Sequence, residues 1–268
     1  MENLALQTLR ALLSLLRNTL RPLGETRRTI LSKFLYGFIQ PLWHLMPDLS
    51  RFTYVAVVDK NLMKFRPLVL SDLLLVLANR DKEPYVQKIF RPKSGETVVD
   101  VGAHIGFYTL KAARDVGPKG TVIAIEPDPQ NFLLLSENIA INHFHNVIAV
   151  NAALSDAAGR RLFYACADPI VSGFQPSSRT RIREVKTVRT MTLSELLQSL
   201  GIDRADWIKV DVEGEELRVL KGGRSVLQNV KNVKIIIEVY DSKIIEYLRK
   251  MGFYTKYLGE IYYFAFND

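Results

Sequence analysis

Apolar and polar positions divide the chain into two parts with different periodicities. Between residues 4 and 20 leucines recur every three or four positions, which places them on one face of a helix that arginines interrupt. A second apolar, aromatic-rich stretch covers residues 30–46, where Lys33 and Pro41 break it. We therefore expect a helical, amphipathic N-terminal extension over residues 1–75.

After residue 90 short runs rich in Val and Ile alternate with helical segments. Uninterrupted apolar strands of this kind are typical of a parallel sheet that helices cover on both faces. We expect a doubly wound α/β sheet over residues 76–268, whose ligand crevice lies beyond the carboxyl ends of the central strands. Its strands are predicted at 97–101, 121–125, 147–150, 207–210 and 234–239, and its helices at 107–114, 128–141, 215–228 and 242–251.

Two segments depart from this alternation. Residues 161–165 and 185–190 alternate like the exposed strands of a hairpin and enclose a polar loop, so we interpret residues 160–190 as an insertion. Near the C-terminus, residues 254–258 and 261–266 flank Gly259-Glu260 and predict a second hairpin.

Charge is concentrated in the N-terminal extension. The chain has 268 residues and a formal net charge of +8. Residues 1–70 hold ten Lys and Arg against four Asp and Glu, a net charge of +6, whereas the other 198 residues carry 26 against 24, or +2. The single cysteine, Cys166, excludes an intrachain disulfide, and no Cys/His spacing matches a structural zinc site. We therefore expect a cytoplasmic protein.

Three partners for the N-terminal extension stay open. Arginines interrupt its apolar runs well short of the ~20 residues of a membrane span, and Glu2 argues against a secretory signal. The helices could pack on the main domain or on a second copy of the chain as a homo-oligomer. They could instead lie on an anionic membrane surface, at the inner membrane face, or bind an apolar acceptor. Nucleic acid is the least favoured partner, because the basic residues are not clustered with stacking aromatics.

The first predicted strand of the sheet ends in a glycine turn over residues 100–106, Asp-Val-Gly-Ala-His-Ile-Gly. Gly102 allows a tight turn, and Gly106 allows the backbone to approach a ligand closely at the helix start. The spacing is not G-x-G-x-x-G, and Asp100 disfavours a phosphate but suits the cationic groups of S-adenosylmethionine. Glu126, 26 residues further on at the tip of the second strand, is placed to accept hydrogen bonds from both ribose hydroxyls.

A group of acids follows the fourth predicted strand. The helix dipole accounts for Glu215 and Glu216 at the start of the next helix, but not for an acid that ends an apolar strand. Asp211 and Glu213 could be helix-terminus acids, an acid–base group beside the transferred methyl, or ligands of a hard cation. Glu238 is a similar charge after three isoleucines at the end of the fifth strand. The catalytic candidates are therefore Asp211, Glu213 and Glu238, and the metal requirement stays open.

These motifs resemble the FkbM family of S-adenosylmethionine-dependent methyltransferases over about residues 80–265. The residues that carry the resemblance are 98–106, Glu126-Pro127, 151–156, 209–216 and Glu238. The glycine turn is common to class I methyltransferases, whereas the Lys-x-Asp-x-Glu-Gly-x-Glu run at 209–216 is specific to the family. The resemblance implies a Rossmann-like class I sheet, mostly parallel with an antiparallel C-terminal hairpin strand, and O-methylation of a hydroxyl on a sugar or natural product.

The resemblance also implies roles for individual residues. Asp211, Glu213 and Glu238 would face the acceptor. His104 and Tyr240 depart from the Asn and His that the family often has at these positions, so a histidine base at residue 240 is missing. The residues expected at the cofactor, from its methionine part through the ribose to the adenine, are Asp100, Gly102, His104, Gly106, Glu126, Pro127, Ala153 and Asp211.

Three classes of function remain open from the sequence. The leading hypothesis is an S-adenosylmethionine-dependent O-methyltransferase that acts on a hydroxyl of a sugar, a lipid headgroup or another small natural product. Asp211 or Glu238 would deprotonate that hydroxyl, with a divalent cation as an optional aid. The alternatives are an RNA methyltransferase that uses the basic N-terminal extension and a cofactor-binding protein without catalysis.

Overall fold

A computed structural model of the chain describes residues 53–67, 69–78, 83–166, 172–176 and 181–268. The helices predicted within residues 4–46 lie outside these ranges. The described residues divide into a larger compact unit, within residues 55–64 and 83–268, and a smaller one that contains residues 53–54, 65–67 and 69–78. No helix within the described ranges is long and apolar enough to cross a bilayer.

A seven-stranded sheet lies at the centre of the larger unit, in the order β11-β12-β10-β9-β3-β4-β5. Five of the strands are parallel, and β12 runs antiparallel between β10 and β11. The mostly parallel class I sheet and its antiparallel C-terminal hairpin are therefore confirmed. The strands are Thr97–Val101 (β3), Thr121–Ile125 (β4), Val147–Val150 (β5), Trp207–Val210 (β9), Lys234–Glu238 (β10), Tyr254–Gly259 (β11) and Tyr262–Phe266 (β12).

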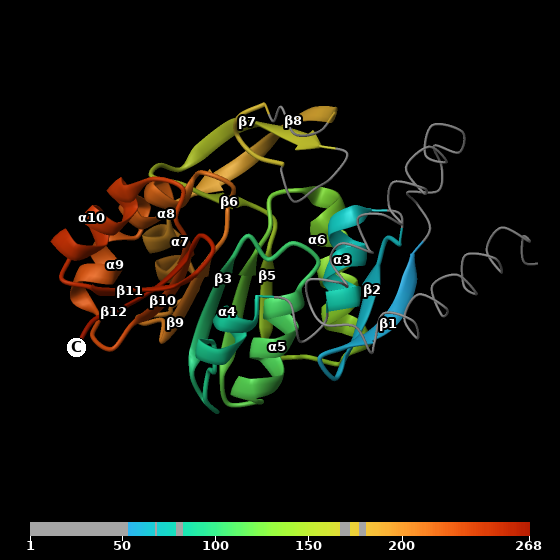
Figure 1. Cartoon of the computed structure of the whole chain (residues 1–268), viewed down its shortest axis with the longest axis horizontal. Helices are drawn as coiled ribbons and strands as arrows, with labels where there is room; N and C mark the ends of the chain where they lie inside the picture. The colour runs from blue at the N-terminus through green and yellow to red at the C-terminus, as the bar shows by residue number, and fades with distance from the viewer. Residues whose placement is uncertain (1–52, 68, 79–82, 167–171, 177–180) are drawn as a thin grey trace, which may run out of the picture. The chain divides into compact units, whose positions relative to one another are not determined.

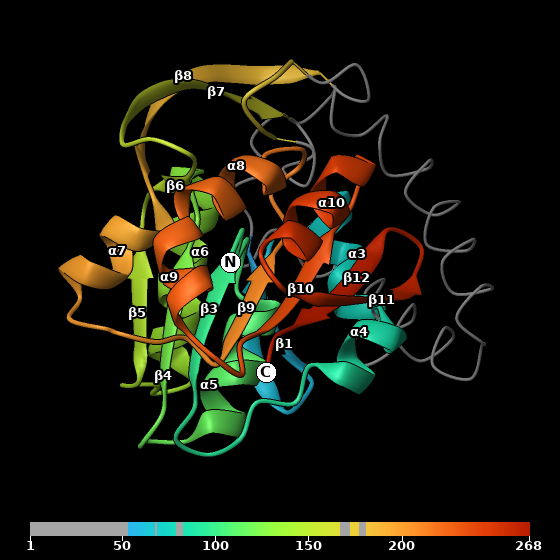
Figure 2. The ribbon, with the colours of Figure 1, turned by 90° about the vertical axis from the view of Figure 1, so that its left-hand side faces the viewer.

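Helices cover both faces of this sheet, which is why its central strands are apolar throughout. In Figure 2, α7 to α10 lie in front of the sheet and α5 and α6 lie behind it. All four residues of β9 are buried, and so are four of the five residues of β3. The helices are Pro84–Ile89 (α4), Phe107–Val116 (α5), Pro129–Ile141 (α6), Leu193–Ser199 (α7), Glu216–Gly222 (α8), Arg224–Asn229 (α9) and Ser242–Lys250 (α10).

The single helix predicted over 215–228 is wrong, because α8 and α9 meet at Gly222 and Gly223. A Cβ on Gly222 would lie 2.0 Å from the backbone oxygen of Ser155, and one on Gly223 would lie 2.8 Å from the side chain of Leu193. Close packing at this point therefore requires the two glycines, and glycine weakens a continuous helix.

The insertion forms a hairpin, as the sequence predicts, from β7 (Gly159–Cys166) and β8 (Ile182–Met191). The short strand β6 (Ala153–Leu154) pairs with the end of β8 and completes a separate three-stranded sheet. Figures 1 and 2 both show β7 and β8 beyond the carboxyl ends of the central strands.

Residues 54–65 differ from the helical pattern predicted for residues 1–75. They form a two-stranded sheet of β1 (Tyr54–Val58) and β2 (Asn61–Phe65). Between the strands Asp59 and Lys60 have φ values of 43° and 72°, the left-handed conformation that two-residue hairpin turns require. Burial in β2 alternates along the strand. This segment therefore follows the two-residue period of a strand and not the period of a helix.

In the smaller unit, α3 (Leu70–Ala78) follows a buried ion pair. The guanidinium of Arg66 donates from Nε to Asp72 Oδ2 at 2.8 Å and from Nη2 to Asp72 Oδ1 at 3.0 Å. Asp72 lies in the first turn of the helix, where the helix dipole also favours its charge. The paired charges therefore fix the start of this helix.

Candidate active site

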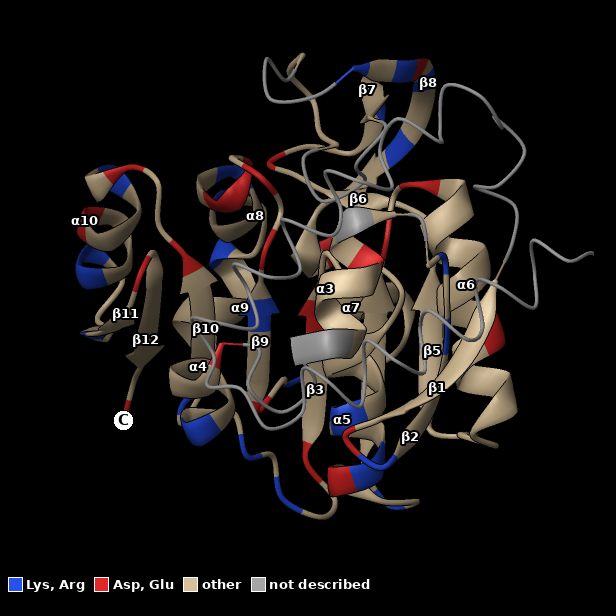
Figure 3. Cartoon of the chain, turned by 45° about the vertical axis from the view of Figure 1, so that its right-hand side comes forward, with Lys and Arg blue, Asp and Glu red and all other residues tan. Residues whose placement is uncertain are grey.

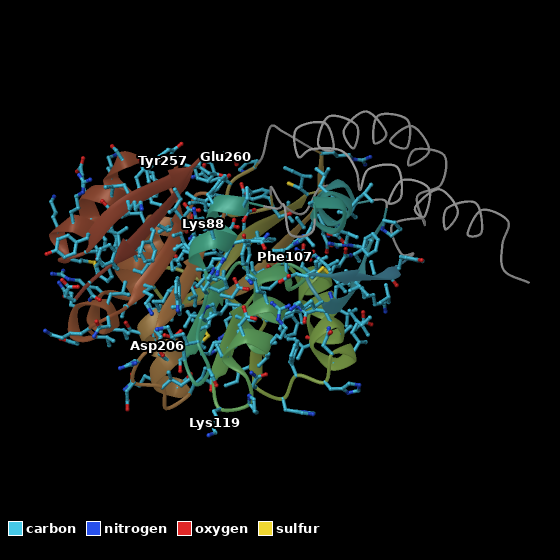
Figure 4. All side chains as sticks on the ribbon, turned by 60° about the horizontal axis from the view of Figure 1, so that its bottom comes forward. Lys88, Phe107, Lys119, Asp206, Tyr257 and Glu260 are labelled. Carbon is cyan, nitrogen blue, oxygen red and sulfur yellow. The ribbon has the colours of Figure 1, made fainter. Side chains whose placement is uncertain are left out.

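The register of the sheet brings the predicted site residues to one edge. Val101 pairs with Ile125 and with Val210, and Val210 pairs with Ile237, so the residues that follow these four strands meet there. In Figure 4, Lys119 and Asp206 precede β4 and β9 and lie toward the lower edge, whereas Phe107, after the carboxyl end of β3, lies above them. The edge that carries the candidates is thus the carboxyl edge, where ligands of open α/β sheets bind.

The glycine turn is required by contacts within the protein. Gly102 has φ +82°, and a Cβ there would lie 1.8 Å from the backbone oxygen of Asp211, so the turn fits tightly against the end of β9. Gly106, at φ +101°, begins α5, and its Cβ would lie 2.9 Å from the side chain of Leu135 on α6. Packing between helices therefore explains Gly106, and the close approach of a ligand there stays a prediction.

Asp100 is buried beneath this turn and keeps one acceptor atom available. Its Oδ2 accepts a hydrogen bond from the Thr109 hydroxyl at 2.6 Å, while Oδ1 has no hydrogen-bond partner among the described residues. Burial raises the pKa of Asp100, and the positive charge of Lys209 opposes that rise. An orphaned carboxylate oxygen next to a glycine turn suits a ligand with a positively charged donor.

Glu126 is held mainly by backbone N–H groups. Its Oε2 accepts from the His104 N–H at 2.9 Å, and its Oε1 accepts from the Asp128 N–H at 2.9 Å and from Asn131 Nδ2 at 3.4 Å. Burial raises the pKa of Glu126 to about 7, although these hydrogen bonds oppose the shift. His104 has φ 52°, a conformation that few residues other than glycine adopt, so it shapes the turn that contacts Glu126.

The two remaining cofactor candidates are Pro127, which directly follows Glu126, and Ala153, which lies beyond the end of β5. Asn151 Nδ2 donates to the backbone oxygens of Glu126 and Pro127 at 2.8 and 3.3 Å, which connects the ends of β4 and β5. Ala153 lies in β6, where its side chain packs in an apolar cluster with Phe163 and other residues of the hairpin. A role for the Ala153 neighbourhood in binding adenine stays a prediction.

Lys209 explains how Asp211 is held at the end of an apolar strand. Its ammonium lies 2.7 Å from Asp211 Oδ2 and 4.7 Å from the centre of the Tyr108 ring, and the residue is 2% exposed. Burial lowers the pKa of Lys209, but the carboxylates of Asp211, Asp100 and Glu83 outweigh burial and raise it. Lys209 is therefore charged and orients Asp211.

Tyr108 and Glu83 belong to this network, although no sequence motif identifies them. The Tyr108 hydroxyl donates to Glu83 Oε2 at 2.6 Å. Glu83 precedes α4 with φ 47°, and its side chain does not cap that helix. The left-handed conformation of Glu83 is visible only in the structure, so the sequence gives no signal for this residue.

Asp211, Glu213 and Glu238 come together as predicted. One carboxylate oxygen of each lies within 4.8 Å of the others, and the Tyr262 hydroxyl donates to Asp211 Oδ2 at 3.4 Å. Burial and the charge of Asp211 raise the pKa of Glu238 to about 9, and a hydrogen bond between Glu238 and Tyr262 opposes the rise. Figure 3 shows this concentration of acidic residues at the end of β10 and the start of α8. We call Asp211, Glu213 and Glu238 the acid cluster.

The other two acids of the run have structural partners. Glu216 Oε1 accepts from the backbone N–H groups of Val212 and Gly214 at 3.3 and 3.1 Å, which fixes the loop before α8. Glu215 forms an ion pair with Arg161 of β7 at 2.6 Å. These two acids therefore hold the loop and the hairpin, while Glu213, at φ 50°, belongs to the acid cluster.

The insertion borders the acid cluster. A Cβ on Gly173 would lie 3.7 Å from the backbone oxygen of Glu213, and Gly173 is joined to Tyr164 of β7 by an isolated bridge. The Arg161 guanidinium lies 4.0 Å from the centre of the Phe174 ring. The loop of residues 172–176 thus approaches the acids from the side of the hairpin.

The residues of this edge fit S-adenosylmethionine. Asp100 offers an unfilled acceptor to an ammonium group, and Glu126 follows the strand next to the turn, where a ribose is bound in such folds. The family model described as "Methyltransferase FkbM domain" matches residues 100–254. The chain belongs to this FkbM family. It is therefore an S-adenosylmethionine-dependent methyltransferase, and the resemblance stated from the sequence is confirmed.

Three named methyltransferases are 27–28% identical to this chain. Methyltransferase sdnD of Sordaria araneosa is 28% identical over 204 residues, which cover 65% of this chain and 74% of the relative. The hexuronic acid methyltransferase AglP of Haloferax volcanii is 27% identical over 187 residues, with 69% and 74% covered. The 31-O-demethyl-FK506 methyltransferase FkbM of Streptomyces tacrolimicus is 28% identical over 194 residues, with 60% and 74% covered.

Among solved structures, a methyltransferase FkbM from Methylobacillus flagellatus KT is similar to this chain. It is 18% identical, with a TM-score of 0.47, and the match covers 75% of this chain and 54% of that one.

Proposed function

We propose that the protein transfers the methyl group of S-adenosylmethionine to a hydroxyl of a sugar, a lipid headgroup or another small natural product. The observation that carries this proposal is the acid cluster, because carboxylates within 4.8 Å of one another can orient and deprotonate a hydroxyl. The names of two relatives support it, since one is a hexuronic acid methyltransferase and another acts on 31-O-demethyl-FK506.

On the cofactor side, we assign Asp100 to the ammonium of the methionine part and Glu126 to the ribose hydroxyls. Gly102 serves by allowing the turn to lie against β9, and His104 serves by donating its N–H to Glu126. When bound, S-adenosylmethionine supplies a methyl group activated by a positively charged sulfur. The cofactor roles of Gly106, Pro127 and Ala153 belong to the same proposal.

On the acceptor side, Asp211 is the proposed base. Lys209 and Tyr262 donate to its Oδ2 and so orient the carboxylate within the acid cluster. In the transfer, a C–O bond forms, the C–S bond breaks with its electron pair moving to sulfur, and the hydroxyl proton passes to Asp211. Because the pKa of Glu238 is raised to about 9, Glu238 keeps its proton at neutral pH and donates a hydrogen bond to the acceptor.

A divalent cation at the acid cluster is a further part of the proposal. Carboxylate oxygens are the ligands that hard cations prefer, and one oxygen of each of the three acids lies close enough to the others to share one ion. A bound cation would displace the proton of Glu238, because a ligating carboxyl group must be deprotonated. If a cation takes part, turnover falls after treatment with EDTA and returns when Mg²⁺ is added. Unchanged turnover after removal of metals would exclude this role.

The location of the enzyme and the partner of residues 1–70 are proposals as well. We propose a cytoplasmic enzyme whose basic extension binds a second copy of the chain or an anionic membrane surface. Sedimentation with anionic vesicles that is lost on deleting residues 1–45 supports the membrane. A concentration-dependent dimer that is lost on the same deletion supports the second copy.

The experiment that tests the proposed function supplies the enzyme with methyl-labelled S-adenosylmethionine and separate acceptors: uronic acid glycosides, lipid headgroup analogues, polyhydroxylated macrolides and RNA. Mass spectrometry would detect an O-methyl product, and Asp211→Asn and Glu238→Gln should lower its rate while S-adenosylmethionine still binds. If both variants keep full turnover, the acid cluster is not catalytic. Methylation of RNA alone would replace the proposal with the RNA alternative.

A further inference from the structure

Two arginines face each other across the hairpin at its end opposite Gly173. Arg160 of β7 and Arg189 of β8 are direct partners in the antiparallel register, and both are exposed. Residues directly opposite in an antiparallel pair project from the same face, and two like charges in this arrangement destabilise the sheet. The pair therefore has an energetic cost that nothing in the strand pairing offsets.

Other basic residues of the hairpin have carboxylate partners. Arg161 pairs with Glu215 at 2.6 Å, Arg183 with Asp128 at 3.5 Å and Lys186 with Glu184 at 3.2 Å. In the described part of the chain, neither Arg160 nor Arg189 has an ion pair or a hydrogen bond through its guanidinium. Figure 3 shows basic residues, in blue, on β8.

Arg160 and Arg189 both line one open cavity of about 650 Å³, together with Thr190, Glu195 and Ser199. This volume lies within the range of about 300–1,000 Å³ that is usual for small-molecule sites. None of its lining residues belongs to the acid cluster or to the glycine turn, so the cavity is separate from the candidate active site.

Glu195 can offset only one of the two arginine charges, and its carboxylate also caps α7: hydrogen bonds from Thr192 lower the pKa of Glu195 most, and the charge of Arg189 lowers it further. Its Oε2 accepts from the N–H and the hydroxyl of Thr192 at 3.0 and 2.9 Å, and the Thr192 hydroxyl oxygen accepts from the Glu195 N–H at 3.0 Å. The cavity is thus lined by two positive charges and by one negative charge that already has donors. An anionic ligand would remove the repulsion between the arginines.

We propose that this cavity binds a phosphate monoester, the group shared by soluble sugar phosphates and phosphorylated lipid headgroups. A phosphate monoester carries close to two negative charges near neutral pH and presents three acceptor oxygens. Its charge matches two guanidinium groups, whose planar N–H donors bind phosphate in pairs. This inference is independent of the proposed methyl transfer, because it uses no residue of the active site.

Calorimetric titration of the full chain with glucose 6-phosphate tests the inference. The variant Arg160→Gln/Arg189→Gln should bind about tenfold more weakly or worse, because charge-assisted hydrogen bonds are lost. The matched control is Arg181→Gln/Arg224→Gln, which removes the same charge from two exposed positions outside the cavity. Equal loss of binding in both double variants would overturn the site, since it would reflect net charge alone.

A change of opposite sign comes from Glu195→Gln. Glutamine keeps the capping box but removes the negative charge from the cavity, so binding should become tighter. Unchanged or weaker binding in this variant would contradict a site governed by charge. Glucose, which lacks the phosphate, should not bind at concentrations that saturate the site with glucose 6-phosphate.

The source of the phosphate is decided by two further probes. Inorganic phosphate should compete with glucose 6-phosphate, and phosphatidylcholine vesicles containing phosphatidic acid present the same group on a lipid. Binding of vesicles that depends on Arg160 and Arg189 identifies a headgroup, and binding of the sugar phosphate without the vesicles identifies a soluble ligand. If no probe shows saturable binding that depends on these arginines, the proposal is wrong.

Discussion

The cofactor side and the acceptor side of the same sheet edge are held in different ways. Glu126 accepts from two backbone N–H groups that the glycine turn and the start of α6 supply. Asp211 is held by the side chains of Lys209 and Tyr262, and Glu238 has one carboxylate oxygen without a hydrogen-bond partner in the described residues. Backbone donors come with the fold, whereas side-chain donors depend on which residues occupy positions 209 and 262.

This difference corresponds to the two functions of the sheet edge, which are binding of the cofactor that the family shares and binding of the acceptor. A site built from backbone groups holds the same ligand wherever the fold recurs, because the turn itself positions the donors. A cluster of crowded carboxylates lacks compensation until a proton, a cation or an acceptor joins it. The raised pKa of Glu238 reflects this uncompensated negative charge and can be tested by titration.

The largest expected effect comes from the turn. Gly102→Ala should lower the free energy of unfolding by more than about 3 kcal/mol. The new Cβ would lie 1.8 Å from the backbone oxygen of Asp211, and the alanine would have to adopt a φ of +82°. Gly95→Ala is the matched control, since Gly95 has φ +85° with nothing within 4 Å. It should lose only about 1–2 kcal/mol. Urea denaturation of both variants measures the difference, and equal losses would show that the contact with β9 is unimportant.

The second effect concerns the link between the two sides. Lys209→Met should lower the free energy of unfolding by about 2–3 kcal/mol, because it leaves buried carboxylates without their cation. Asp211 is partly exposed, which keeps this loss below that of a fully buried ion pair. Lys234→Met is the control, since Lys234 also lies over an aromatic ring, 4.9 Å from Trp207, and pairs with Glu96, but is more exposed. Its loss should stay below about 1 kcal/mol. Thermal unfolding that ranks the two variants in reverse would refute the role given to Lys209.

A smaller effect is the pH dependence that Glu238 produces. The folded protein keeps the Glu238 proton up to about pH 9, whereas the unfolded chain releases it near the ordinary glutamate value of 4.5. Between these values the folded state binds more protons, so this group makes stability fall as pH rises, by up to about 1.4 kcal/mol per pH unit.

Glu238→Gln should therefore flatten the fall of unfolding free energy between pH 6 and pH 9, in the range set by its pKa of about 9. Glu246→Gln, an exposed position on α10, should leave the slope unchanged. The measurement is a series of urea titrations across this range. A wild-type slope that Glu238→Gln does not alter would mean that the acid cluster is not strained by burial.

Much of the fold could be predicted because burial on both faces leaves a strong pattern. The apolar runs at β3, β4, β5 and β9 coincide with the observed strands, and both hairpins are present. The helix α7 was missed although Thr192 and Glu195 form a capping box, which is a recognisable helix start. The hairpin at 54–65 does not stand out in the sequence because its strands are short and most of β1 is exposed.

The acids of the site could be predicted for a different reason. Asp211 and Glu238 stand out because charge is rare at the end of an apolar strand. Glu83, Tyr108 and Tyr262 could not be found in this way, since an aromatic residue in a helix or hairpin looks like core, and their hydrogen bonds join elements distant in sequence. The structural reason for Gly106 likewise depends on Leu135, a contact that spacing does not reveal.

Equilibrium binding of S-adenosylmethionine tests the separation of the two sides most directly. Calorimetry on the wild type, Glu126→Gln and Glu238→Gln needs no knowledge of the acceptor. We predict that Glu126→Gln weakens binding by about tenfold or more, because the amide replaces one of the two acceptor oxygens with a donor, and that Glu238→Gln changes it by less than about twofold. Equal losses in the two variants, or a larger loss for Glu238→Gln, would contradict the account.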